Sequence, residues 1–398
     1  GGNVSAVRGT LSVKVSKLTG TLTAKAALLK GNLSFSAKAW ETPEGTDGTF
    51  GVTLTAKGGE TLELLVRQNR ISGSLKGGSL GAEKLSLDGA RNRFADARDE
   101  EAQALLAAFK GYYTMALPPA APGISASEQV GAAPEGVGYL ALTIGAKGSA
   151  KVAGVLADGT KVSRAGRLLL FDGCRPDACV PLFAPLYGKK GWVGGLLWVI
   201  PEGGAVTTDD EFGWFLRWEN PGKKGPDGFS MLLDVCGRFY GTGSALAAGY
   251  LFGADTGDTA YHDARGVAAW TQIPAGLPVA VEGGRIKAPK GAKPKKVTEE
   301  GVTRYVYDAV NPAGVTLSFA SKSGIFKGKF SLYGEYDAKG APVVKALSVP
   351  YVGILVPVRD GRFDDLPVGM GHCLIPDTDP VRKAYWPKRS QPVWLEEK

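Results

Sequence analysis

Apolar and polar residues alternate along three separate stretches of the chain, each of which begins at a glycine. The stretches open with GTLSVKV at Gly9, with GYLALTI at Gly138 and with GVTLSFA at Gly314. Each continues through a polar turn into a second alternating run. Side chains that repeat with a period of two lie on opposite faces of a β-strand, one toward a core and one toward water. The pattern therefore predicts three related antiparallel β-meanders.

Glycines recur where these expected strands turn. The second run closes on a tight turn at LLKG, LADG or DAKG, which end at Gly31, Gly159 and Gly340. Asp158 followed by Gly159 is typical of a two-residue hairpin turn, in which both central residues need positive φ. Glycine inside a strand favours a bend or a close backbone approach, as strongly curved sheets require. We therefore expect each module to be barrel-like or a strongly curved sheet.

One segment breaks the alternation and predicts a helix. In DARDEEAQALLAAFKG, Asp96 is a candidate N-cap, and the apolar residues from Ala102 to Phe109 follow the spacing of one helical face. The expected fold is all-β, with three antiparallel meander or barrel-like modules and this one short connecting helix. The expected parts are β-module 1 at residues 1–95, the helix at 96–110, a tryptophan-rich β-module 2 at 111–225, and β-module 3 at 226–398 with a loop-rich insertion at about 250–300.

The composition is that of a protein that folds around hydrophobic cores. Of 398 residues, 57 are glycine, yet 44% are hydrophobic, which argues against wholesale disorder. No apolar run reaches the roughly 18 residues of a membrane-spanning helix, so we expect no transmembrane segment. The chain opens with GGNVSAVRG, without an initiator methionine or a signal peptide, and we expect a mature form or a piece of a longer protein.

The net charge of +8 draws attention to one segment. Much of the excess lies in GRIKAPKGAKPKK, where Lys287, Lys290 and Lys293 are candidate contacts for an anionic glycan, lipid or nucleic acid. The alternative, which we favour, is a solvated loop that its prolines stiffen. No aromatic residue interleaves with the cations as single-strand binding requires, so no nucleic-acid partner is expected.

Cysteine usage bears on the compartment. The chain has four cysteines, Cys174, Cys179, Cys236 and Cys373. The first two bound the CRPDAC loop, where a disulfide is plausible in a secreted protein. The other two fall in the expected first and last strands of module 3, where a disulfide would close a barrel if their Cα atoms lay within about 7 Å. With two histidines in the chain, no metal site is expected, and the even cysteine count favours an extracytoplasmic compartment.

Aromatic strands mark the second module. The tryptophans concerned are Trp192, Trp198, Trp214 and Trp218. As a surface, they would offer a platform for the rings of a polysaccharide. The alternative is a core, because large aromatic rings fill the interior of barrels. The run GWVGGLLWV is apolar at odd and even positions alike, which favours the core.

Candidates for catalysis are few. Asp209 and Glu211 precede Trp214, and paired carboxylates beside aromatics are typical of glycosidases, but we favour a solvated turn. His262 lies in an aspartate-rich loop that lacks the spacing of a calcium site. His372 and Cys373 are strand neighbours that face opposite ways. No phosphate-binding or nucleophile-elbow motif is present. We expect neither an enzyme nor a cofactor.

The alternating strands, the LADGTK turn and the segment RNRFADARDEEAQALLAAFKGYYTMAL together resemble the Gly-rich β-repeat modules of large, mostly uncharacterised bacterial secreted or surface proteins. The resemblance implies secretion and a surface or matrix role, without catalytic residues. The expected function is a non-enzymatic structural or adhesive protein, whose partners are other surface proteins or extracellular polysaccharide. A polysaccharide-binding protein that uses the tryptophan strands and basic loop, and a glycan-active enzyme, are the alternatives.

Overall fold

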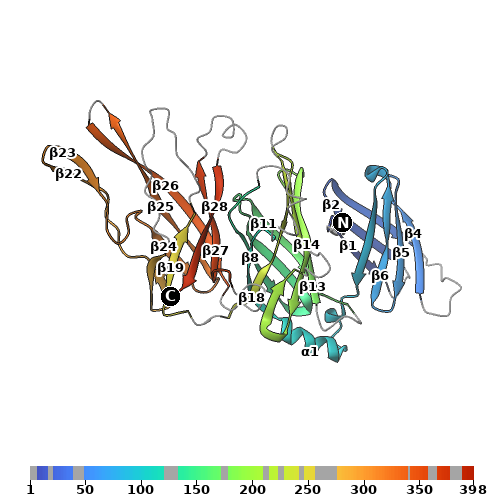
Figure 1. The fold of residues 1–398 in the computed structure, drawn as a ribbon. Helices are drawn as coiled ribbons and strands as arrows, with labels where there is room; N and C mark the ends of the chain where they lie inside the picture. The colour runs from blue at the N-terminus through green and yellow to red at the C-terminus, as the bar shows by residue number, and fades with distance from the viewer. Residues whose placement is uncertain are drawn as a thin grey trace. The chain divides into compact units, whose positions relative to one another are not determined.

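The computed structural model is all-β with one α-helix among the residues that it describes. Those residues are 7–16, 21–38, 49–120, 133–171, 178–208, 215–222, 228–241, 246–255, 276–338, 341–356, 365–376 and 388–398. The predicted fold class is confirmed at this level, and Figure 1 traces the elements in chain order.

The N-terminal part is a two-layer β-sandwich. One sheet is formed by β1 (Gly9–Val15), β2 (Leu22–Leu28) and β3 (Gly31–Ala37), and the other by β4 (Thr49–Thr55), β5 (Glu60–Arg67), β6 (Arg70–Gly77) and β7 (Lys84–Ala90). The strands of each sheet pair in sequence order, as short hairpins favour. Leu22 and Phe35 of the first sheet and Leu54, Leu62 and Leu75 of the second form one buried cluster, so the core lies between the sheets.

The helix α1 (Glu100–Phe109) occupies the predicted position, but its cap differs from the prediction. The N-cap is Asp99, whose side chain accepts a hydrogen bond from the Ala102 amide, and not Asp96. Asp96 instead ends a 3-10 turn, η2 (Arg93–Ala95). Two aspartates, Asp96 and Asp99, precede the helix and made the cap ambiguous in the sequence, and the contact with Arg93 selects Asp99.

The second large sheet has 11 strands. They are β8 (Gly111–Leu117), β9 (Gly138–Ile144), β10 (Ser149–Val155), β11 (Lys161–Arg167), β12 (Leu169–Leu170), β13 (Ala178–Leu186), β14 (Gly191–Ile200), β15 (Ala205–Thr207), β16 (Leu216–Asn220), β17 (Phe229–Leu233) and β18 (Cys236–Phe239). The order is β11-β10-β9-β8-β18-β15-β14-β13-β12, with β16 beside β14 and β17 beside β16. Short 3-10 turns, η1 (Gly78–Leu80), η3 (Ala146–Gly148) and η4 (Glu202–Gly204), punctuate the chain.

The third large sheet has eight strands in the order β21-β20-β19-β28-β27-β26-β25-β24. Their bounds are β19 (Gly249–Ala254), β20 (Leu277–Glu282), β21 (Arg285–Lys287), β24 (Thr316–Ala320), β25 (Ile325–Ala338), β26 (Ala341–Leu355), β27 (Gly369–Pro376) and β28 (Lys388–Glu397). The two end strands, β21 and β24, contact each other, so this sheet curls nearly into a barrel around Phe252, Phe326 and Phe330. A separate hairpin, β22 (Lys295–Glu299) and β23 (Val302–Val306), forms a two-stranded sheet of its own.

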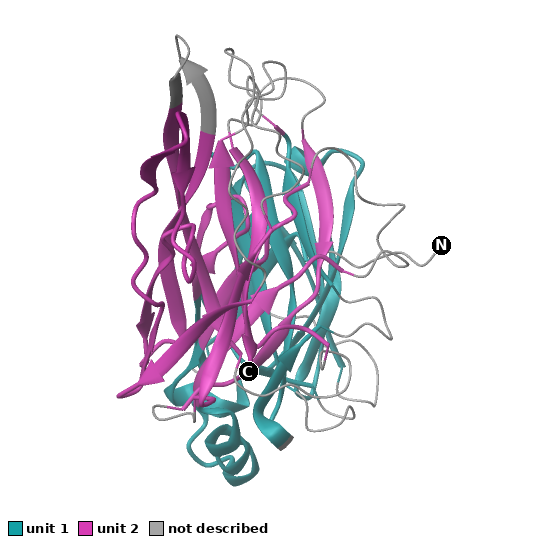
Figure 2. Cartoon of the chain, turned by 60° about the vertical axis from the view of Figure 1, so that its left-hand side comes forward, with its two compact units in different colours: residues 1–110, 143–152, 164–221 teal, residues 111–142, 153–163, 222–398 magenta. Residues whose placement is uncertain are grey.

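The prediction of three modules is not confirmed. Two of the sheets are nearly closed and barrel-like, and contacts group the chain into two compact units, residues 1–110, 143–152 and 164–221, and residues 111–142, 153–163 and 222–398 (Figure 2). Phe229–Phe239, expected to open module 3, contributes β17 and β18 to the 11-stranded sheet, where β18 pairs with β8. The expected insertion at about 250–300 contains β20, β21 and β22, because its glycines and prolines separate short strands.

Candidate binding surface

The basic loop, defined here as residues 285–296, runs from β21 of the eight-stranded sheet into the first residues of β22. Its strand residues alternate, with Arg285 and Lys287 exposed and Ile286 only 1% exposed between them. Lys290 and Lys293 are exposed as well. The structure thus places the three predicted lysines on one continuous loop and turns each toward solvent.

The loop is fastened to the barrel by a buried asparagine. Asn311 is fully buried, and its Nδ2 donates to the carbonyls of Pro289 (2.8 Å) and Val315 (2.9 Å). Its Oδ1 accepts a hydrogen bond from the Val315 amide at 2.8 Å. Both donors and one acceptor position of the amide are therefore in use, which is the condition for burying such a group at low cost.

An aspartate makes a second attachment. The Asp308 carboxylate accepts hydrogen bonds from the backbone amides of Asn311 (2.8 Å), Val310 (2.9 Å) and Ala292 (3.2 Å). These donors, that of Asn311 first, hold the pKa of Asp308 below its usual range. Pro289 and Ala292 are thus both tied to the segment 308–315, and the lysines between and beside them stand on a fixed backbone. The sequence predicted a solvated loop stiffened by prolines, and it gave no sign of these hydrogen bonds to residues 308–315.

The charges on this loop are incompletely compensated. Lys287 pairs with Glu282 across the β20–β21 hairpin, at 3.0 Å between Nζ and Oε2. Within the described ranges, Lys290 and Lys293 have no carboxylate partner. Two ammonium groups on an anchored loop attract anions by Coulomb forces, and the attraction falls with salt because both are in water. No group of three metal-binding side chains occurs in the described part of the chain.

Two of the four predicted tryptophans, Trp192 and Trp218, are buried and present no ring face to a ligand. Trp218 is fully buried and donates its Nε1 hydrogen to the Tyr187 hydroxyl at 3.0 Å, and Trp192 is 8% exposed beside Phe183. Trp198 is half-buried, and Trp214 lies outside the described residues. The core interpretation therefore holds for Trp192 and Trp218, because both faces of these strands are covered.

Three of the four cysteines are described and all three are buried, and Cys179 and Cys373 carry free thiols. Cys179 lies on β13, Cys236 on β18 and Cys373 on β27, and burial raises the pKa of Cys179 and of Cys373 to about 12. The disulfide expected between Cys236 and Cys373 is not formed, because β18 belongs to the 11-stranded sheet and β27 to the eight-stranded one. Cys174 lies outside the described residues, and its expected partner is a free thiol.

Of the residues singled out for catalysis, the structure describes only His372 and Cys373, and both are buried. Asp209, Glu211 and His262 lie outside the described residues. His372 is 2% exposed, and burial lowers its pKa. Its Nδ1 lies 3.0 Å from the Val137 carbonyl, which can only accept, so the ring donates there and serves as a fastening.

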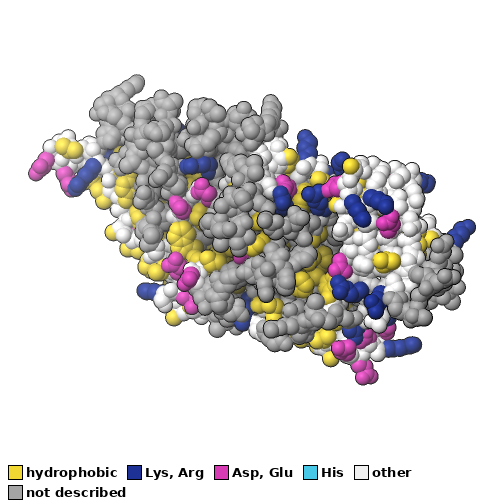
Figure 3. Space-filling view, turned by 45° about the vertical axis from the view of Figure 1, so that its right-hand side comes forward, with side chains coloured by type: hydrophobic (Ala, Val, Ile, Leu, Met, Phe, Trp, Pro, Cys, Tyr) yellow, Lys and Arg dark blue, Asp and Glu magenta, His cyan; other side chains and the backbone are white. Residues whose placement is uncertain are grey.

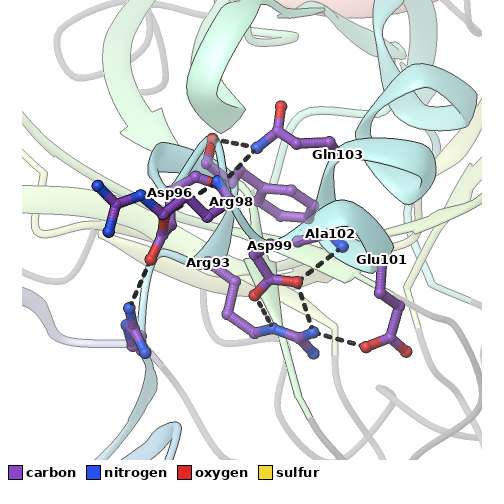
Figure 4. A network of polar contacts seen from close by, with 9 residues as sticks. Arg93, Asp96, Arg98, Asp99, Glu101, Ala102 and Gln103 are labelled. Carbon is purple, nitrogen blue, oxygen red and sulfur yellow. Dashed lines mark hydrogen bonds and ion pairs between the residues drawn. The ribbon is translucent and has the colours of Figure 1, made fainter.

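A polar network that the sequence did not single out surrounds the start of α1 (Figure 4). Arg93 makes a bidentate pair with Asp99, at 2.7 and 2.9 Å, and also contacts Glu101 at 2.6 Å. The hydrogen bonds that the Arg93 side chain and the Ala102 amide donate to Asp99 lower the pKa of Asp99 to about 2. Gln103 donates to the carbonyls of Phe94 and Asp96. Every described partner belongs to the connector or the helix, so the network fixes the connector.

Charges elsewhere are mixed. On the face drawn in Figure 3, Lys and Arg side chains are interspersed with Asp and Glu. In the sandwich, Arg70 pairs with Asp88. Lys76 likewise pairs with Glu63. Such exposed pairs contribute little to stability and leave no field of a single sign.

Comparison with protein-family models, with curated proteins and with solved structures finds no match for this chain. The resemblance to Gly-rich β-repeat modules stays a prediction. In the described residues, no helix has the length and apolar character needed to cross a membrane.

Proposed function

We propose that this chain is a non-enzymatic structural or adhesive protein, secreted or at the cell surface, that contacts anionic polysaccharide through the basic loop. The observation that carries the proposal is the double attachment of the loop through Asn311 and Asp308. A loop that only spans two strands needs no such fastening, whereas a contact loop benefits because less conformational entropy is lost on binding.

The polar groups at the other predicted positions support a non-enzymatic role. His372 donates to a backbone carbonyl, and the Trp218 indole to a tyrosine hydroxyl, so these groups hold elements together. An extended anionic polymer can bind to a short row of exposed lysines without an enclosed pocket, because it repeats the same carboxylate along its length. The extracytoplasmic location rests on the module pattern alone, since Cys179 and Cys373 are free thiols.

Binding to an immobilised polyuronate and to a neutral glucan tests this function. We expect binding to the polyuronate, little to the glucan, and weakening as salt is raised from 50 to 300 mM, about one to two halvings of the Debye length. The double variant Lys290→Gln and Lys293→Gln should bind roughly threefold to tenfold more weakly, since each exposed charge contact contributes modestly.

The matched control replaces two exposed lysines of other elements, Lys25→Gln on β2 and Lys161→Gln on β11, with the same change in net charge. It should bind as the wild type does. Equal losses in both double variants would show that net charge alone attracts the polymer and would contradict a role for the basic loop.

A further inference from the structure

The hairpin of β22 and β23 has an edge with no strand beside it. Figure 1 draws the two strands as a hairpin apart from the eight-stranded order, and β22 pairs with β23 alone among the described strands. β23 lies on the barrel side, where it contacts β26 and where Tyr307 packs on Tyr333 at 5.6 Å. A lone two-stranded hairpin is marginally stable in water, so added strands would stabilise it.

The turn of the hairpin fixes which backbone groups face outward. Glu300 and Gly301 both have positive φ, 49° and 79°, as in a type I′ turn. In such a hairpin the flanking pair, Glu299 and Val302, exchanges backbone hydrogen bonds, and every second pair after it does so too. The amides and carbonyls of Lys296 and Thr298 therefore point away from β23.

The side chains of β22 read KKVTE, with Val297 half-buried and the other four exposed, and this order complements itself when two copies run antiparallel. With Val297 on the twofold axis, Lys295 of each copy lies opposite Glu299 of the other, twice. Val297 meets its own copy, and Lys296 lies opposite Thr298. These last two are the residues whose backbone groups face outward, so they form the hydrogen-bonded pairs. The ion pairs and the valine pair take the positions where side chains approach most closely.

Other pairings of the hairpin lack this match. A parallel arrangement of two β22 strands would bring Lys295 beside its own copy. Antiparallel pairing of two β23 strands, centred on Arg304, would bring two guanidinium groups together, and like charges in opposition destabilise a sheet. Lysines on an edge strand usually prevent such pairing, but in the β22 register they meet a glutamate and a threonine.

We propose that β22 is a self-association edge, at which a second copy of this chain adds antiparallel through Lys295, Val297 and Glu299. The product is a four-stranded sheet, β23-β22 of one copy and β22-β23 of the other. Val302 and Val306 of β23, which are 68% and 45% exposed, lie on the same face as Val297. On that face of the four-stranded sheet, valines of the two copies therefore lie on both sides of the twofold axis. Two five-residue strands bury less than a permanent interface does, so the dimer is weak and depends on concentration. The inference is independent of anion binding.

Covalent trapping tests the register in the full chain. Val297→Cys places a thiol against its own copy at a non-hydrogen-bonded position, within reach of a disulfide. Under oxidised glutathione we expect a disulfide-linked dimer on a non-reducing gel. The matched control, Thr298→Cys on the adjacent position, lies opposite Lys296 and should be trapped at the wild-type background level. Equal trapping of both variants, or none for Val297→Cys, would overturn the proposal.

Charge reversal tests whether the partner at this edge is a second copy of the same chain. Lys295→Glu puts two glutamates in opposition on each side of the axis, and Glu299→Lys puts two lysines there. Each variant alone should dimerise roughly tenfold more weakly by sedimentation velocity, whereas their equimolar mixture restores both ion pairs and should regain wild-type association. If the reversals leave association unchanged, or if the mixture stays as weak as its components, the edge does not pair in this way and serves a different chain.

Discussion

At the scale of single residues, buried polar side chains act as fastenings between segments distant in sequence. His372 of β27 donates to Val137, and the Ser390 hydroxyl of β28 donates to Ala157. Gln391 donates to the Glu135 carboxylate at 2.8 Å. Gly136 lies among them, and a Cβ there would come within 2.6 Å of the His372 Cβ. These contacts bind residues 135–137 and 157 to the β27–β28 hairpin within one unit.

The burial of His372 makes stability depend on pH. Burial lowers its pKa in the folded state below the ordinary value of 6.5, and the hydrogen bond to Val137 and attraction to Asp158 offset this in part. The unfolded chain therefore takes up a proton first as pH falls. The stabilisation is fully present above pH 6.5 and is lost as pH falls from there through the folded-state pKa, by at most about 1.4 kcal/mol per pH unit.

Urea unfolding at pH 8, 7, 6 and 5.5 measures this dependence. His372→Gln should flatten the curve in this window, because the variant has no imidazole to protonate. Identical slopes for wild type and His372→Gln would assign the pH dependence to other groups.

At the scale of elements, one glycine explains how β24, β25 and β26 fit together. Gly328 of β25 lies opposite Leu317, and a Cβ on it would stand 1.7 Å from the Thr316 carbonyl oxygen. The Tyr351 hydroxyl of β26 crosses this position and donates to the same carbonyl at 2.7 Å. An aromatic side chain thus covers a strand glycine, which is one way in which curved sheets keep their packing.

Gly328→Ala should therefore lower the free energy of unfolding by about 1–3 kcal/mol, the usual cost of forcing an atom into a packed site. The comparison is Gly166→Ala on β11, where the new Cβ would meet the Pro181 carbonyl oxygen at an ordinary 3.7 Å. That variant should be neutral or slightly stabilised. Chemical denaturation of both checks the difference, and equal stability of the two would contradict the close-approach argument.

At the scale of the whole molecule, the sequence predicted what is local. Alternation identified β1 to β3 and the β24–β25 hairpin, and the doubly apolar run GWVGGLLWV indicated the burial of Trp192. The sequence could not predict which strands share a sheet. Alternation with a period of two indicates a strand but not its pairing partner, and β18 pairs with β8 across more than a hundred residues. The composition revealed the basic loop, but not the hydrogen bonds that hold it. Asn311 precedes a proline, which indicates a turn, and this pattern does not predict its hydrogen bond to Pro289.

The attachment of the basic loop has a consequence for proteolysis. Lys290–Gly291 is a peptide bond of the kind that trypsin cleaves, and an exposed loop is where nicking starts. Cleavage needs a stretch of chain to leave the surface, which the Asn311 and Asp308 hydrogen bonds oppose. We expect slow cleavage after Lys290 in the wild type and, by mass spectrometry of early digests, about tenfold faster cleavage in Asn311→Ala, because losing these buried bonds costs about 1–3 kcal/mol. An unchanged rate would mean that the loop opens without breaking them. The buried Asn311 can in this way protect a lysine-rich, exposed loop from proteolytic cleavage.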